Sequence, residues 1–408
     1  MAIERIPVSK LRLGMYVSRL DRPWRETPFL FQGFYVEDAD ELNALRRLCR
    51  HVYIVAADER PVQRPSAEGI DVAELDIDDV LELQMQDAMA ESDVPFVEEV
   101  DSAKKYHADL TEFARDAWSG VQQGRIMDAD TVRESVGVMV DSISRNPDAF
   151  VWLARVKDYD SYTYAHAVNV AAWCTLFGRR LGFPTKSLED LAAGGLFLDI
   201  GNIKLPKQVL EKSGRLTDEE WQLVKTHVGH SVDLLRATEG IPDSIVEMVG
   251  AHHERYDGSG YPRGLEGDEI PLYGQIAGIV DFYVSVTFPR PAGKAVSSDF
   301  ALNVLFKQRN VFFKSELVAQ FIRVIGLYPA GSLVELSTGE VAVVLCQHPT
   351  RRLRPRVMLV LDPEKKPYDS YPIVDLVKET EDRHGRPLAI RRGVRDGEYR
   401  IDFSRLPF

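Results

Sequence analysis

Two adjacent histidines, His252 and His253, mark the stretch of the chain with the clearest chemical potential. They follow an apolar, helix-like run (residues 241–251) and precede a glycine-rich loop. Neighbouring residues on a helix point about 100° apart, so both imidazoles can face one pocket without competing for the same position. Glycine lets the loop turn sharply and approach a ligand closely. The loop residues are Asp257, Gly258, Ser259, Gly260, Tyr261 and Pro262. For the histidine pair alone, a helix end with solvated imidazoles is the alternative interpretation.

Two aspartates are isolated charges in otherwise apolar segments. Asp199 is the only ionisable residue in residues 191–203, and Asp281 is the only charged residue between Leu272 and Phe288. Moving a carboxylate out of water costs free energy unless a cation, a metal or a set of hydrogen-bond donors meets it. Either aspartate alone could instead cap a neighbouring backbone. Together with the histidine pair, they favour a shared metal site.

Histidines are concentrated in the same part of the chain. Five of the nine lie between residues 166 and 253. His166 lies in a mostly apolar segment, where a hydrogen-bonded core histidine is the alternative. His227 and His230 lie on one predicted helix, so one of them could reach the pocket while the other faces solvent or a neighbour. Imidazole and carboxylate ligands without cysteine fit an iron, manganese or zinc hydrolytic centre.

The elements that must position these residues are mainly helical. Helical spacing of apolar residues runs from about residue 102 to 327, whereas short strand patterns lie on either side of it. We therefore predict a mainly α protein with an all-helical domain, a small N-terminal α+β domain and a small C-terminal β appendage. The predicted segments are an α+β domain (1–60), an acidic linker (61–100), a helical domain (101–328, core 151–328), a β appendage (329–375) and a basic tail (376–408).

Composition limits the class of protein. The 408 residues are 45% hydrophobic and 28% charged, which is typical of a soluble globular protein. No long apolar run and no signal-peptide pattern appear, and three scattered cysteines form no disulfide or zinc pattern, so we expect a cytoplasmic protein. Residues 65–103 hold 13 acidic and no basic residues, which accounts for the whole net charge of −13. We expect neither nucleic-acid nor membrane binding, because a basic footprint with interleaved aromatic residues is missing.

The segment from about Ser161 to Leu327 resembles the HD-GYP domains, a branch of the HD metal-dependent phosphohydrolases that hydrolyse cyclic di-GMP. The sequence His-His-Glu-Arg-Tyr-Asp-Gly-Ser-Gly-Tyr-Pro at 252–262, continued by Arg-Gly-Leu-Glu-Gly-Asp-Glu-Ile-Pro-Leu, is close to the family signature. Ile-Lys-Leu-Pro at 203–206 and Gly-Arg-Leu-Thr-Asp-Glu-Glu at 214–220 also look like the family. The first 60 residues resemble a domain of unknown function that often precedes HD-GYP domains.

The resemblance implies a set of metal ligands and one missing member. The implied ligands are His166, Asp199, His227, His252, His253 and Asp281. Asp199 would be the central catalytic carboxylate, bridging two ions. His227, His252 and His253 would complete one centre. His166, Asp281 and the histidine that gives the HD motif its name would complete the other, but Leu198 stands at that histidine's position, and leucine cannot bind a metal.

Further departures from the family pattern cluster around the implied reaction centre. They are Asn202 for a lysine near the scissile phosphate, Val284 for an aspartate, Phe288 for a serine and Gly293 for a basic residue. Arg290 is kept and Lys294 is displaced by one place, and the resemblance implies that these two contact the nucleotide phosphate. The Gly-Tyr-Pro loop is intact while the reaction centre is altered.

The sequence therefore favours a cyclic di-GMP signalling protein that binds the nucleotide, or a protein partner, with little or no hydrolysis. The partner would meet the Gly-Tyr-Pro loop and could be a cyclic di-GMP synthase domain. We expect one divalent ion rather than two, iron or manganese, or none. One alternative is an active phosphodiesterase in which a water fills the coordination position facing Leu198. Another is a nucleotide-independent adaptor or scaffold. The sequence gives no indication of oligomeric state.

Overall fold

The computed structural model describes most of the chain. The described residues are 3–12, 15–21, 34–36, 39–59, 92–156, 162–210, 212, 216–288 and 295–408, without 383, 396, 400, 402, 404, 405 and 408. The chain divides into two compact units: Met1–Gly69 with Leu205–Lys225, and Ile70–Lys204 with Thr226–Phe408. Arg290 and Lys294, the predicted nucleotide contacts, lie outside the described residues, as do residues 61–91 of the predicted linker.

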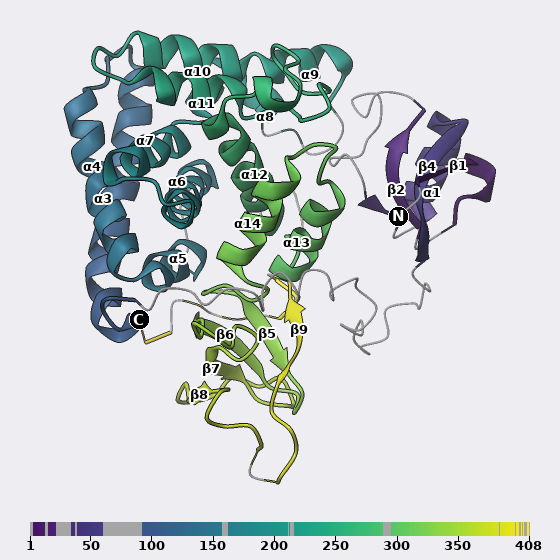
Figure 1. Ribbon diagram of the computed structural model, residues 1–408, viewed down its shortest axis with the longest axis vertical. Helices are drawn as coiled ribbons and strands as arrows, with labels where there is room; N and C mark the ends of the chain where they lie inside the picture. Colours follow the sequence, from purple (N-terminus) through teal and green to yellow (C-terminus); the bar gives the residue numbers. More distant parts are fainter. Residues whose placement is uncertain are drawn as a thin grey trace. The chain divides into compact units, whose positions relative to one another are not determined.

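The first unit contains a small antiparallel sheet with one helix (Figure 1). Its elements are β1 (Ile3–Pro7), β2 (Met15–Leu20), β3 (Phe34–Tyr35), α1 (Ala39–Leu48) and β4 (His51–Glu59), and the strand order is β1-β4-β2-β3. Its core includes Leu11, Val17, Leu45 and Val52. The short helices α8 (Lys207–Leu210) and α9 (Asp218–Lys225) belong to the same unit. The predicted α+β character is confirmed.

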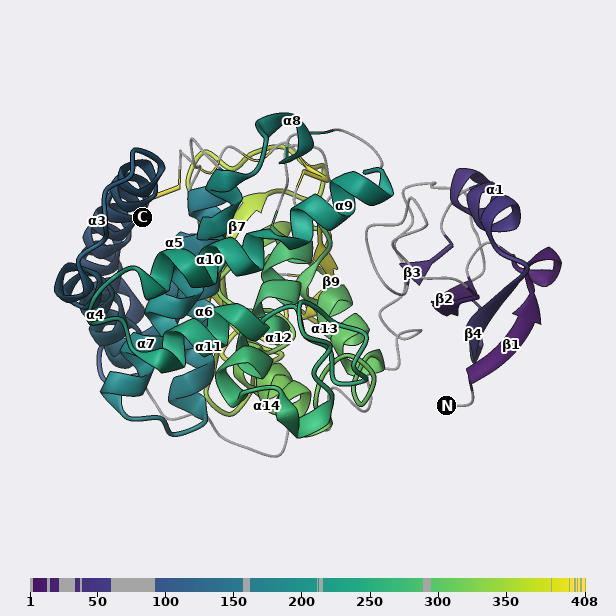
Figure 2. The same ribbon diagram turned by 90° about the horizontal axis from the view of Figure 1, so that it is seen from above.

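The second unit is built from helices around α6, as Figures 1 and 2 show. Its helices are α3 (Phe96–Gln122), α4 (Ala129–Arg145), α5 (Pro147–Val156), α6 (Tyr162–Arg180), α7 (Thr185–Leu196), α10 (His227–Arg236), α11 (Asp243–Ala251), α12 (Leu272–Thr287), α13 (Ser298–Lys307) and α14 (Ser315–Ile325). Every residue of α6 from Ala165 to Gly178 is buried. A helix that is apolar all round has no solvent face, so α6 is enclosed by its neighbours.

Helix α3 begins earlier than the sequence predicts. It starts at Phe96, within the predicted acidic linker, because Phe96 and Val100 are buried in the helical core. Of the two acidic residues between them, Glu98 is exposed, whereas the buried Glu99 is neutralised by partners on α4. The Glu99 carboxylate accepts hydrogen bonds from Ser142 Oγ at 2.7 Å and from Arg145 Nε at 2.8 Å on α4. An ion pair between the buried Glu99 and the partly exposed Arg145 therefore connects α3 to α4.

A five-stranded antiparallel sheet follows the helices and confirms the predicted β appendage. Its strands are β5 (Leu333–Leu336), β6 (Val341–Cys346), β7 (Arg356–Leu361), β8 (Ile373–Asp375) and β9 (Ile390–Val394), in the order β8-β7-β6-β5-β9. All residues of β5 are buried, and the β5–β6 turn contains Gly339 in the left-handed region (φ 100°). The sheet joins the helical core where the Gln347 amide donates to the Asp148 carboxylate of α5 at 3.0 Å.

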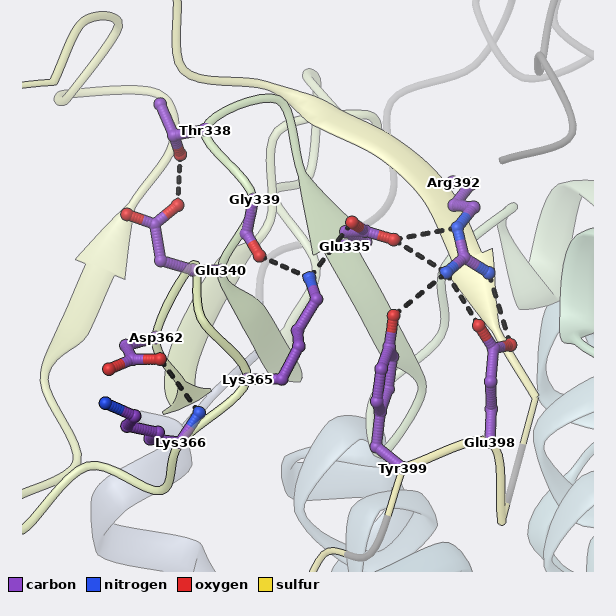
Figure 3. Close-up of polar contacts among 10 residues, drawn as sticks. All are labelled: Glu335, Thr338, Gly339, Glu340, Asp362, Lys365, Lys366, Arg392, Glu398 and Tyr399. Carbon is purple, nitrogen blue, oxygen red and sulfur yellow. Dashed lines mark hydrogen bonds and ion pairs between the residues drawn. The ribbon is translucent and has the colours of Figure 1, made fainter. Parts of the chain in front are cut away.

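The prediction of a basic tail at residues 376–408 needs one correction. Part of this segment forms strand β9, which pairs with β5 in the sheet. Figure 3 shows the network that fixes β9 beside β5. The buried Glu335 carboxylate accepts hydrogen bonds from Lys365 Nζ at 3.0 Å and from Arg392 Nε at 2.8 Å. Arg392 also donates to Glu398 at 2.6 Å. Arg392 of the predicted tail therefore forms ion pairs within the sheet, which composition alone could not show.

Among the described helices, none is both long and apolar enough to cross a bilayer.

Candidate metal centre

All six predicted ligands meet inside the second unit, although they come from separate elements. His166 lies on α6, Asp199 follows α7, His227 begins α10, His252 and His253 follow α11, and Asp281 lies on α12. Two groups of potential ligand atoms result, and within each group these atoms lie within 4.8 Å of one another. The first group is Asp199, His227, His252 and His253; the second is His166, Asp199 and Asp281. Asp199 belongs to both.

The first group has the arrangement that a metal ion requires. His227 Nε2 lies 3.2 Å and His252 Nε2 lies 3.8 Å from Asp199 Oδ1. His252 Nδ1 donates to the Val249 carbonyl at 2.7 Å, which leaves the lone pair of the neutral imidazole on Nε2. That Nε2 is buried and makes no hydrogen bond with any described residue. A metal ligand histidine is oriented by such a bond from its other nitrogen, so this group fits a divalent ion.

The second group is arranged differently. His166 Nε2 lies 3.0 Å from Asp281 Oδ1, a hydrogen bond, and 3.8 Å from Asp199 Oδ2. His166 Nδ1 is buried and has no hydrogen-bond partner in the described part of the chain. The orienting bond that His252 makes is thus missing for His166. Leu198, at the position where the resemblance implies a histidine, is 1% exposed and supplies no ligand atom.

The electrostatics of the centre favour a bound cation. Burial lowers the pKa of His252, and burial with the neighbouring histidines lowers the pKa of His253. Burial would raise the pKa of Asp199, but the hydrogen bond from His227 and the charges of nearby histidines hold it well below its usual range. In their neutral forms His252 and His253 offer lone pairs to a metal ion, and the ionised Asp199 carboxylate offers a negative charge that such an ion can balance. The Asp199 side chain is 26% exposed, so the centre is accessible from solvent.

A glycine holds the backbone of the first group together. Gly201 lies in the short 3-10 turn Ile200–Lys204 after Asp199, and its amide donates to Ser231 Oγ on α10 at 2.8 Å. A Cβ at this position would overlap the His227 carbonyl oxygen. The turn can therefore approach the start of α10 only with glycine there. Asn202 in the same turn is half-buried and places a neutral amide where the resemblance implies a lysine.

The Gly-Tyr-Pro loop supports the centre from one side. The Tyr261 ring stacks on the His253 ring with centroids 4.7 Å apart, and the Tyr261 amide donates to the His253 carbonyl at 3.2 Å. Asp257 Oδ1 accepts a hydrogen bond from the Ser259 amide at 3.0 Å, which closes the turn. A Cβ at Gly260 would overlap the Glu254 backbone. The loop is thus packed against a ligand histidine, and its exposed edge includes Asp257, Ser259 and Pro262.

Two residues of this site were not predicted. The buried Glu254 carboxylate accepts hydrogen bonds from the amides of Arg263 at 2.8 Å and Leu265 at 3.0 Å, and so holds the loop. Its position directly after the histidine pair was the available signal. Tyr162 stacks on His166 with centroids 5.6 Å apart. Its spacing of four residues from His166 places it on the same helix face.

Three further positions named from the sequence, His230, Val284 and Phe288, supply no ligand atom to either group. His227, and not His230, belongs to the ligand groups, which decides the alternative left open by the sequence. Val284 is buried, and the Phe288 ring lies 6.0 Å from the Tyr162 ring. Val284 and Phe288 therefore place an apolar and an aromatic side chain where the resemblance implies an aspartate and a serine.

Comparison with known proteins identifies three domains in the chain. Residues 138–317 match the HD domain family, residues 3–132 match a domain of unknown function (DUF3391), and residues 333–381 match a KOW domain associated with HD domains.

Relatives of known name include a cyclic di-GMP phosphodiesterase of Pseudomonas aeruginosa, 31% identical over 92% of this chain and 89% of that protein. A cyclic di-GMP phosphodiesterase response regulator of Xanthomonas campestris is 32% identical over 42% of this chain and 46% of its own length. A solved structure of an HD-GYP-type protein from Bdellovibrio bacteriovorus covers 79% of this chain and 98% of its own, with a TM-score of 0.46 and 16% identity. With its DUF3391 domain preceding the HD domain, the chain belongs to the HD-GYP family of the HD superfamily.

Proposed function

We propose that this protein binds cyclic di-GMP at a centre holding one divalent metal ion, and that it hydrolyses the nucleotide slowly or not at all. The observation that carries the proposal is the buried Leu198 beside Asp199, which leaves the second ligand group one residue short. The choice of ligand is supported by relatives named as cyclic di-GMP phosphodiesterases.

The first ligand group would hold the ion. Asp199, His227, His252 and His253 offer one carboxylate and three imidazoles, a set that suits iron or manganese. When bound, such an ion polarises a phosphate oxygen and lowers the pKa of a coordinated water. The Val249 carbonyl keeps His252 in the tautomer that binds the ion, and Tyr261 fixes the plane of His253.

The second ligand group is poorly prepared for an ion. Its histidine, His166, is already hydrogen-bonded to Asp281 and lacks an orienting partner among the described residues. While that bond is kept, His166 Nε2 is not free for a second ion, which would be left with the carboxylates of Asp199 and Asp281. One ion rather than two follows from this asymmetry.

Hydrolysis should suffer from the same asymmetry. Two-metal sites stabilise both the attacking and the leaving oxygen of a phosphodiester. Loss of a single group that stabilises the transition state commonly costs about 10²- to 10³-fold in rate. Here a ligand is replaced by Leu198 and a cation by Asn202, so two such losses coincide at one reacting phosphate.

We also propose that the exposed edge of the Gly-Tyr-Pro loop is where a protein partner binds. Asp257, Ser259, Pro262 and Arg263 are exposed, whereas Tyr261 packs inward on His253. A partner such as a cyclic di-GMP synthase domain could therefore contact the outer residues without displacing the inner one.

The test combines metal analysis, binding and turnover. Protein purified without oxygen is loaded with iron or manganese, the metal content is measured, and cyclic di-GMP binding and hydrolysis are assayed beside an Asp199→Ala variant. We expect close to one ion per chain, nucleotide binding and little turnover. Rapid turnover that Asp199→Ala abolishes would refute the proposal and show an active phosphodiesterase. No binding with or without metal would indicate an adaptor instead.

A further inference from the structure

Arg155 is an arginine whose charge has no acidic partner among the residues that the structure describes. It lies in the last turn of α5 and is half-buried. Its Nη1 group lies 3.2 Å from Tyr283 Oη and 3.1 Å from Ser298 Oγ, both neutral hydroxyls. Across the described ranges, no carboxylate forms an ion pair with it; the nearby Asp299 is hydrogen-bonded to Ser297 instead. Buried charges in proteins are normally paired or bind a ligand, so an uncompensated guanidinium needs an explanation.

A small polar cavity adjoins this guanidinium. It has a volume of about 10 Å³ and is lined by Arg155, Asn169, Trp173, Val284, Thr287 and Phe288. That volume admits one water-sized group. Arginine has five N–H donors, and both hydrogen bonds of Arg155 come from Nη1. The remaining donors suit an anionic oxygen.

The cavity lies close to the second ligand group. Asn169 is three residues after His166 on α6, and Val284 is three residues after Asp281 on α12. Residues three apart share a helix face and are separated by about 4.5 Å along the axis. His166 and Asp281 are themselves in contact, so the cavity is about one helical turn from them.

We propose that Arg155 binds an oxygen of the second phosphate group of a bound cyclic dinucleotide. A cyclic dinucleotide has two phosphates, and only one can lie at the metal ion. The other carries a negative charge into a partly buried site and needs a cation there. Arginine meets phosphate with a planar fork of donors, which makes such contacts strong and specific. Because Asn202 has removed one cation from this centre, Arg155 would supply another. This inference rests on the proposed function.

The experiment compares two ligands and three variants. Binding of cyclic di-GMP and of GMP, which has a single phosphate, is measured by calorimetry on the metal-loaded protein. The variants are Arg155→Met, Arg155→Lys and, as a matched control, Arg179→Met, since Arg179 is also half-buried and donates to a neutral oxygen, the Ser144 carbonyl, at 3.1 Å. Thermal melting shows whether each variant folds.

We expect Arg155→Met to weaken cyclic di-GMP binding roughly 10- to 100-fold, as for loss of a charged hydrogen bond, and to leave GMP binding unchanged. Arg155→Lys should weaken it less, and Arg179→Met should have no effect. If Arg155→Met does not fold, Arg155→Lys provides the test: it should weaken binding of cyclic di-GMP and leave binding of GMP unchanged. Equal losses for both ligands, or none, would overturn the inference alone. Absence of cyclic di-GMP binding by the unmodified protein would overturn the proposed function with it.

Discussion

Asp148 should make the protein more stable in mild acid than at neutral pH. It lies in the first turn of α5 and accepts a hydrogen bond from the Gln347 amide at the end of β6, where the sheet meets the helices. Burial raises the pKa of Asp148 to about 6, and the Gln347 hydrogen bond and the nearby Arg352 offset burial only in part. The folded protein therefore binds this proton more tightly than the unfolded chain does. Ionisation of Asp148 opposes folding.

The size of the effect follows from the shift. A rise from 3.8 to about 6 corresponds to about 3 kcal/mol at 1.36 kcal/mol per unit. This contribution is fully present below the unfolded pKa and is lost as the pH rises through the folded value near 6. Between pH 5 and 7.5, roughly 1 kcal/mol of stability should be lost. The side chain keeps some contact with water, so these values are upper limits.

Asp148→Asn removes the ionisation and keeps an acceptor for the Gln347 amide. At pH 7.5 we expect this variant to be more stable than the unmodified protein by about 1–3 kcal/mol, with the gap narrowing by about 1 kcal/mol at pH 5. Urea unfolding at the two pH values measures both numbers. Asp101→Asn, at an exposed position on α3, is the control and should change neither. A less stable Asp148→Asn at pH 7.5, or a gap independent of pH, would refute the reasoning.

Three further predictions concern the metal centre and the sheet. Leu198→His should raise the metal content from about one toward two ions per chain, measured by elemental analysis; an unchanged content would show that the second group fails for another reason. Glu254→Gln should weaken the hydrogen bonds from the Arg263 and Leu265 amides and lower the free energy of unfolding by about 1–2 kcal/mol, measured by urea unfolding. An unchanged free energy of unfolding would show that Glu254 does not anchor the loop. Glu335→Ala should cost about 3 kcal/mol because it removes the buried carboxylate that lies between Lys365 and Arg392 and leaves Arg392 with Glu398 alone of its two described carboxylate partners. Glu340→Ala, beside it on the β5–β6 turn, should cost much less.

Much of the centre could be predicted because its residues are chemically out of place in their segments. Asp199 and Asp281 are single charges in apolar runs, and His252 and His253 adjoin a glycine-rich loop. Such residues need partners, and the helical periodicity around them places those partners in one core. The mainly α fold with small β-containing parts followed from the same periodicity.

What the sequence concealed depends on contacts between distant segments. Strand β9 was hidden because its arginines resemble a solvated tail, although Arg392 is bonded to Glu335, 57 residues away. The start of α3 was hidden because Glu99 looks like part of an acidic linker until Arg145 is brought beside it. In both cases charge composition predicted exposure, whereas an ion pair made burial possible.

The two ligand groups, which form the two halves of the metal centre, differ in how their histidines are oriented. This difference bears more directly on metal binding than the number of ligands does. His252 is oriented by the Val249 carbonyl and His253 by the stacked Tyr261 ring, so protein contacts set the orientation of both rings in the first half. In the second half His166 bonds directly to Asp281, and Leu198 and Phe288 provide apolar neighbours instead of ligands. A preorganised site binds its ligand without the cost of ordering side chains. Selection for binding would preserve the first half, whereas selection for two-metal hydrolysis would have to preserve both.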